Sequence, residues 1–252
     1  MRFPCWLRCL SGGCALFALL VAGGAQAADG LVPYDAEYKI KISVLGGTMR
    51  TQVFEVGEAF MARSIITPTG LAAVLTSGSI LEQSEFEPYA GGFRPRHYES
   101  MDTLSSHEAT IRFDFDWDAN VVAGDINDEE FEFMMSGPVQ DRVSIQYQLM
   151  QNLRNGTDGG QYALLDGDEL KLLTVTNIGK RTVKVPFGRF DAVGIQHQAE
   201  NSSRVSTLWC APELGYLPVV IEQHKNGKLQ VRAVLSDYRP TSAEPAKPAA
   251  GQ

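Results

Sequence analysis

Three aspartates at alternate positions are the residues whose type and spacing come closest to a metal site. Asp114, Asp116 and Asp118, followed by Asn120, match oxygen-ligand positions of a calcium loop. Ala119, however, occupies the position at which such a loop needs glycine, and apolar residues alternate with the aspartates as they do in a strand. We therefore expect these carboxylates to share the solvated face of a strand and to hold no metal.

Nucleophilic and basic side chains show no catalytic spacing. The four histidines are scattered along the chain at His97, His107, His197 and His224. Ser84 lacks the glycines of a nucleophile elbow, and no glycine-rich phosphate loop follows a strand. We therefore predict no catalytic residue and no cofactor. A hydrolase site assembled from distant residues, with Ser84 as the testable nucleophile, is the alternative.

Aromatic side chains are the remaining candidates for a binding site. They are numerous enough to fill the core of a small barrel or to line a cavity within it, and filling by side chains is the usual outcome. The candidates that we select for the lining of an apolar site are Phe54, Phe113, Phe115, Trp117 and Trp209.

Alternation of apolar and polar residues predicts that strands must position these side chains. Tyr38, Ile40 and Ile42 alternate with Lys39 and Lys41, which places one face of a strand in a core and the other in water. The further predicted strands are residues 49–56, 60–66, 80–86, 96–101, 110–117, 161–165, 170–178, 181–185, 190–199, 206–210, 219–224 and 229–238. Turn chemistry separates them, including a turn at residues 179–180 and a loop at residues 88–95 that holds two prolines and two glycines.

One helix interrupts this pattern. It is predicted to begin at Pro138, to carry Asp141 near the positive end of its dipole and to end at Asn155. Residues 71–75 fit either a helical turn or the start of a strand. Many short strands with one helix exclude a doubly wound fold. They predict a mainly β, single-domain curled antiparallel sheet or barrel-like fold, which the helix covers or plugs.

The first 27 residues predict an exported precursor. Arg2 and Arg8 precede an apolar stretch, and the small residues Ala25 and Ala27 suit signal peptidase. The apolar stretch is shorter than the roughly 20 residues that cross a bilayer. We expect cleavage after Ala27 and no transmembrane segment in the mature chain, which would comprise a β-rich domain (28–239) and a disordered tail (240–252) rich in proline and alanine.

The net charge of the predicted mature chain argues against nucleic acid as a partner. Loss of Arg2 and Arg8 reduces Lys and Arg from 22 to 20 against 30 acidic residues, a net charge near −10. A nucleic-acid backbone would be repelled by such a protein.

Cys210 is the one cysteine outside the leader, and its apolar neighbours predict a buried, inert thiol.

Several stretches together resemble the bacterial family catalogued as domain of unknown function 3108. They are LEQSEF (81–86), GFRP (92–95), FDFDWD (113–118), VPFGRFDA (185–192) and LWCAPELGYLPV (208–219). The resemblance spans nearly all of the predicted mature chain. It implies an exported periplasmic protein of Gram-negative bacteria, and it brings no activity, cofactor or catalytic residue.

We therefore expect a periplasmic, non-enzymatic protein that binds an apolar ligand such as an envelope lipid. The aromatic residues on an exported β scaffold motivate this hypothesis. The expected form is loosely similar to that of the lipoprotein carriers of the periplasm, an analogy between folds. The alternative, from another class, is a scaffold or assembly factor that binds an envelope protein through a sheet edge or an exposed loop.

Overall fold

Amphipathic strands make up most of the chain in the computed structural model, which describes residues 30–42, 45–104 and 108–241. In chain order they are β1 (Tyr34–Ile42), β2 (Leu45–Val56), β3 (Ala59–Thr69), β4 (Ile80–Tyr89), β5 (Gly92–Asp102), β6 (Ala109–Asp116), β7 (Val121–Ile126), β8 (Glu129–Met134), β9 (Val139–Gln140), β10 (Gly160–Asp166), β11 (Glu169–Val185), β12 (Gly188–Ala199), β13 (Arg204–Ala211), β14 (Leu217–Lys225) and β15 (Lys228–Pro240). The helical segments are α1 (Leu71–Leu75), α2 (Ser144–Arg154) and the 3-10 turn η1 (Pro212–Leu214).

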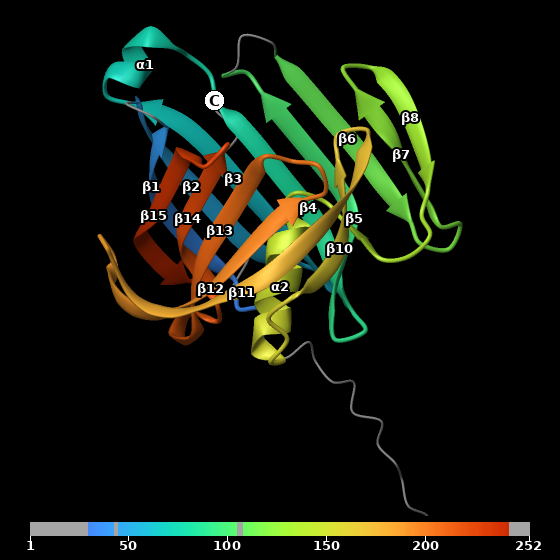
Figure 1. The fold of residues 1–252 in the computed structure, drawn as a ribbon. Coiled ribbons are helices and arrows are strands. Elements are labelled where there is room, and N and C mark those ends of the chain that lie inside the picture. The colour runs from blue at the N-terminus through green and yellow to red at the C-terminus, as the bar shows by residue number, and fades with distance from the viewer. Residues whose placement is uncertain (1–29, 43–44, 105–107, 242–252) are drawn as a thin grey trace, which may run out of the picture.

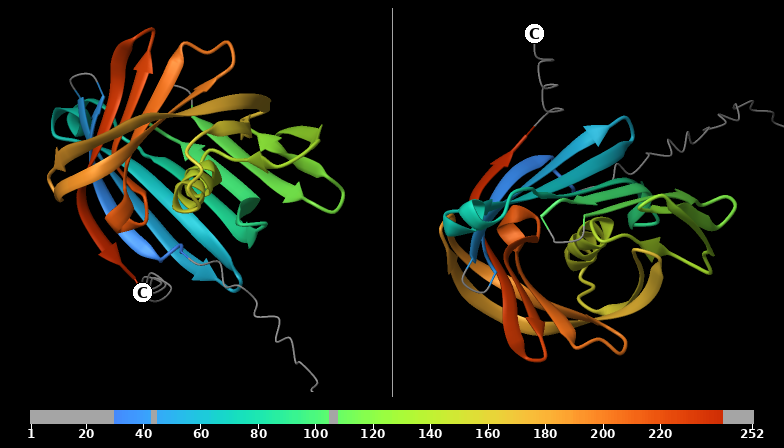
Figure 2. Two further views of the ribbon diagram at one scale, coloured as in Figure 1. Left: turned by 60° about the horizontal axis from the view of Figure 1, so that its bottom comes forward. Right: turned by 90° about the horizontal axis from the view of Figure 1, so that it is seen from above.

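All of these strands belong to one open sheet. Its order is β8-β7-β6-β5-β4-β3-β2-β1-β15-β14-β13-β12-β11-β10-β9. Neighbouring strands are antiparallel except β9 and β10, which pair in parallel. The sheet curls strongly, so that β9 and β10 come to lie across from β5, while β6, β7 and β8 project away from the curl (Figures 1 and 2).

The helix α2 lies inside the curl and packs on both of its walls (Figure 2). Tyr147 and Met150 join a large core cluster that includes residues of β1, β4 and β5. Ile145, Leu149 and Leu153 instead pack in a second cluster with residues of β10–β13. Because its apolar residues contact both clusters, the helix is stabilised as a plug between two apolar surfaces.

The structure confirms the predicted fold class, a mainly β curled sheet with one principal helix. It also resolves residues 71–75 as the short helix α1. Cys210 is buried in the second core cluster, as predicted, and burial raises the pKa of its thiol well above the usual range.

Three local predictions are wrong. The helix begins at Ser144 because Val139 and Gln140 pair with β10 as the short strand β9. Residues 179–180 are not a turn: β11 continues through them with an irregularity between Asn177 and Gly179. The predicted loop at 88–95 is a tight turn, since β4 runs to Tyr89 and β5 starts at Gly92.

The predicted leader, residues 1–27, lies outside the described residues, as do His107 and residues 242–252 of the predicted tail. Pro240, the first residue of that tail, ends β15 and pairs with Tyr34. Within the described ranges, no helix has the length and apolar character required to cross a membrane.

Candidate functional site

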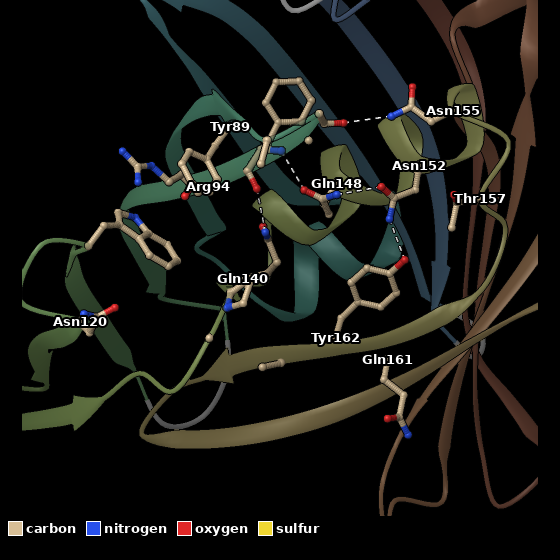
Figure 3. Close-up of a pocket in the computed structure, with 18 residues that line it drawn as sticks. Tyr89, Arg94, Asn120, Gln140, Gln148, Asn152, Asn155, Thr157, Gln161 and Tyr162 are labelled. Carbon is tan, nitrogen blue, oxygen red and sulfur yellow. Dashed lines mark hydrogen bonds between the residues drawn. The ribbon is translucent and has the colours of Figure 1, made fainter.

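A pocket of about 660 Å3 opens where the turn between β4 and β5 faces α2 and β10 (Figure 3). Its walls come from four segments of the chain: residues 89–94, residues 117–120, residues 137–157 and residues 161–163. The curl of the sheet places these segments together, because β9 closes against β5 and β10 pairs with β9. The pocket therefore exists only in the folded barrel-like arrangement.

One polar row of α2 forms the inner wall of the pocket. Gln148, Asn152 and Asn155 lie four and three residues apart, which places them on the same side of the helix. Gln148 Oε1 accepts a hydrogen bond from the backbone N–H of Phe93 at 2.8 Å. Asn155 Nδ2 donates to the carbonyl of Gly91 at 3.0 Å. These bonds fix the helix to the turn between β4 and β5.

A chain of amide hydrogen bonds continues across the pocket to β10 (Figure 3). Gln148 Nε2 donates to Asn152 Oδ1 at 2.8 Å, and Asn152 Nδ2 donates to the hydroxyl of Tyr162 at 2.7 Å. The Tyr162 hydroxyl in turn donates to the carbonyl of Gly159 at 3.3 Å. Each group in the chain orients the next, so the amides present a fixed pattern of donors and acceptors.

Gln140 of β9 supplies a buried acceptor with unused capacity. Its Nε2 donates to the carbonyl of Phe93 at 2.9 Å and links β9 to β5. Its Oε1 is buried without a hydrogen-bond partner among the described residues. An unsatisfied buried carbonyl oxygen costs free energy in the folded state.

Two aromatic rings flank the pocket mouth with a guanidinium between them. Arg94 lies over the ring of Tyr89 at 4.3 Å and near the ring of Trp117 at 5.7 Å. Glu87 pairs with Arg94 at 2.6 Å, which balances its charge. Trp117 Nε1 donates to the carbonyl of Pro95 at 2.7 Å, and this bond fixes the indole. Trp117 also stacks on Phe115, with centroids 5.7 Å apart, so the aromatic rings at the mouth are held in a fixed orientation.

The lining therefore combines neutral amides, hydroxyls and aromatic faces. Arg94 is the one charged side chain among the residues that line the pocket. Such a lining matches an uncharged ligand with several hydroxyl or amide groups and an apolar face, because amides pair with hydroxyls and ring faces cover C–H groups.

A buried carboxylate secures the start of α2 beside this pocket. Asp141 Oδ1 accepts the backbone N–H groups of Val143 and Ser144, both at 2.7 Å, and Oδ2 accepts the Ser84 hydroxyl at 2.6 Å. These bonds satisfy donors at the helix start and attach the helix to β4. Burial is the largest influence on the Asp141 carboxyl and raises its pKa to about 6, although the three hydrogen bonds favour the charged form.

The raised pKa of Asp141 predicts a pH-dependent stability. The native state holds this proton up to about pH 6, whereas the unfolded chain releases it near 3.8, so stability from this group falls as the pH rises between these values. We expect the free energy of unfolding of the wild type, relative to Asp141→Asn, to fall by about 2 kcal/mol between pH 4.5 and 7. Urea unfolding at several pH values measures it.

The comparison with Asp141→Asn is needed because His197 acts in the opposite direction. Burial lowers the pKa of His197 to about 4, so this histidine adds stability as the pH rises through the same range. Both proteins contain His197, and its contribution cancels in the difference. A difference that does not change with pH would show that Asp141 has an ordinary pKa.

The structure disperses the five candidate aromatic residues. Trp117 borders the pocket, whereas Phe113, Phe115 and Trp209 pack in the large core cluster. Phe54 is half-buried and lies on the face of β2 opposite to the buried Val53.

Ser84 is buried in the core, whereas the three aspartates of the candidate calcium loop are exposed to solvent. Ser84 is fully buried on β4, and its hydroxyl donates to a carboxylate rather than to a histidine. Asp114 and Asp116 are exposed on one face of β6 and Asp118 is exposed in the following turn, as expected. Across the described ranges, no three His, Cys, Asp or Glu residues gather closely enough to hold a metal ion.

Sequence reasoning did not select the amides of the pocket. Gln140, Gln148, Asn152 and Gln161 line it together, although none of them belongs to a recognised motif. The available signal was the helical spacing of Gln148, Asn152 and Asn155 on an amphipathic helix.

Comparison with known proteins gives a family and a fold. The profile described as "Protein of unknown function (DUF3108)" matches residues 33–234. No curated protein matches the chain.

Solved structures resemble the fold at low sequence identity. A protein of Brucella abortus, described as a beta-barrel-like protein of domain of unknown function DUF1849, is 11% identical with a TM-score of 0.56, covering 84% of this chain and 99% of that one. At this identity the likeness concerns the fold alone. A candidate lipoprotein of Parabacteroides distasonis is 12% identical (TM-score 0.37; 83% of this chain and 96% of that one). A candidate exported protein of Bacteroides fragilis is also 12% identical (TM-score 0.33; 83% and 97%).

Proposed function

The chain belongs to the DUF3108 family, and we propose that it is an exported, non-catalytic binding protein whose pocket takes a neutral polyhydroxylated group, such as a saccharide. The observation that carries this proposal is the row of hydrogen-bonded amides facing the aromatic mouth. Saccharides present hydroxyl groups at their edges and C–H groups on their faces. Both surfaces have a counterpart in the lining.

The preset geometry of the amides supports a binding role. Gln148, Asn152 and Tyr162 already hold one another, so a ligand would find them oriented and would lose little free energy in ordering them. A periplasmic location fits the leader expected from the sequence.

The same pocket gives limited support to the hypothesis of an apolar ligand. Phe93, Trp117, Pro138 and Ala163 contribute apolar surface to its walls. The inside of the curl, where a long acyl chain would lie in a carrier, is occupied by α2 and its core contacts. The geometry therefore favours the saccharide, and a lipid would bind through a polar headgroup.

Loss of the aromatic mouth should weaken saccharide binding. We expect Trp117→Ala to reduce the affinity for a neutral oligosaccharide about tenfold or more, because a fixed aromatic ring of the lining is removed. Saturation-transfer NMR with a panel of neutral oligosaccharides and with dodecylphosphocholine measures both ligand classes on the full mature chain.

Phe187→Ala is the matched control, since Phe187 is a partly exposed ring in the turn between β11 and β12, away from the pocket lining. It should bind saccharides as the wild type does. The proposal would be overturned if no oligosaccharide bound to the wild type. It would also be overturned if dodecylphosphocholine were the one ligand that bound and Trp117→Ala bound it with the same affinity as the wild type.

A further inference from the structure

The strand β8 ends one side of the sheet with a free edge. It pairs with β7 on one side, and within the described part of the chain no strand pairs with the other side. Figure 1 shows β8 on the outside of the extension formed by β6, β7 and β8. A free edge of this kind is a template for a strand from another protein.

The turn before β8 determines which backbone groups face the edge. Asn127 and Asp128 both have positive φ (53° and 68°), as in a two-residue type I′ turn. In such a hairpin Ile126 and Glu129 form the first hydrogen-bonded pair, and every second pair repeats it. The N–H and C=O groups of Glu130, Glu132 and Met134 therefore point away from β7.

The outer face of this extension is strongly acidic. Asp114, Asp116 and Asp125 share this face with Glu130 and Glu132, and residues 109–134 as a whole contain eight acidic side chains and one basic side chain, Arg112. Arg112 pairs with Asp125 at 3.4 Å, and His97 contacts Asp114 at 2.8 Å. Glu130 and Glu132 are exposed on the edge strand itself, so unbalanced negative charge lies beside the free backbone groups.

The opposite face of β8 is aromatic. Phe131 and Phe133 are half-buried and pack against the large core cluster, with their ring centroids 5.8 Å apart. A strand added beside β8 would place every second side chain next to these rings. Its intervening side chains would lie on the acidic face.

We propose that β8 is a docking edge for an extended basic segment of another protein, in which Lys or Arg alternates with apolar residues. The main-chain hydrogen bonds come from Glu130, Glu132 and Met134, the basic side chains meet Glu130 and Glu132, and the apolar side chains pack beside Phe131 and Phe133. This inference is independent of the pocket and of its ligand.

Charge also disfavours a second copy of this chain as the occupant. Two β8 strands paired antiparallel about Phe131 would place Glu130 opposite Glu132 at both ends of the contact. Like charges directly opposite one another destabilise a strand pair. The edge is therefore selective for basic strands.

A labelled peptide that alternates lysine with valine over the length of β8 tests the proposal. Fluorescence anisotropy with the full mature chain should show saturable binding, and an isomer with its lysines and valines in separate blocks should bind about tenfold more weakly. Glu130→Lys/Glu132→Lys should reduce binding of the alternating peptide about tenfold and favour its glutamate analogue.

Two further variants distinguish strand pairing at the β8 edge from general electrostatic attraction. Glu200→Lys/Glu213→Lys makes the same charge change at exposed positions away from β8 and should leave binding unchanged. Glu132→Pro removes an edge-facing N–H without removing a bond to β7, and it should abolish binding. Equal binding of the two peptide isomers, or full binding by both β8 variants, would overturn the proposal.

Discussion

Asp141→Ala should lower the free energy of unfolding by about 3 to 5 kcal/mol. The carboxylate accepts the N–H groups of Val143 and Ser144 and the hydroxyl of Ser84, and all of these groups are buried. Alanine would leave three donors without a partner at the start of α2. Equilibrium urea unfolding at pH 7 measures the loss.

Ser84→Ala is the control that separates the carboxylate from one of its partners. It removes a single hydrogen bond and leaves Asp141 bound to the two backbone N–H groups, so we expect a loss of about 1 to 2 kcal/mol. If both variants were as stable as the wild type, Asp141 would not secure the helix.

Phe86→Ala should cost about 4 kcal/mol. The ring of Phe86 is fully buried on β4, stacks on Tyr147 of α2 at 4.8 Å and meets the edge of Phe93 at 5.3 Å. Its removal leaves a cavity between the sheet and the helix, where rigid neighbours on both sides limit collapse.

Phe54→Ala makes the same chemical change on the other face of the sheet. Phe54 is half-buried beside the buried Val53, so we expect a loss below about 1.5 kcal/mol. Thermal and urea unfolding of the two variants give the comparison. Equal losses would show that the two faces of the sheet do not differ in packing as described.

Much of the fold follows from local pattern. The alternation in residues 34–42 determines which face of β1 is buried, and Tyr34, Ala36, Tyr38 and Ile40 are all buried there. Apolar residues at helical spacing predict the helix, and Asn155, followed by Gly156, predicts its end, where the structure has the C-cap.

The errors arise where tertiary pairing overrides local preference. Pro138 suits a helix start, yet Val139 and Gln140 pair with β10, and Asp141 then provides the acceptors that the helix start needs. Gly179 suits a turn, yet β12 pairs with β11 from Leu173 to Val185 and the ladder absorbs the irregularity beside Gly179. The pairing of Val139 and Gln140 with β10 is not visible in the local sequence.

The pocket could not be predicted from local sequence patterns, because it too depends on tertiary structure. Its walls come from a turn, a helix, β9 and β10, and the curl of the sheet brings them together. Trp117 was selected as an aromatic residue, but its place at the mouth depends on the hydrogen bond to Pro95. Sequence patterns predict faces of strands, whereas a pocket requires the position of each strand in the curl.

Titration of the isotopically labelled mature chain with a neutral oligosaccharide, followed by two-dimensional NMR, tests the proposed binding site most directly. We predict that the side-chain amide signals of Gln140, Gln148 and Asn152 and the indole signal of Trp117 shift together and saturate. The binding role of the pocket would be contradicted if these signals stayed unchanged at saturating oligosaccharide, or if the shifts lay on residues outside the lining.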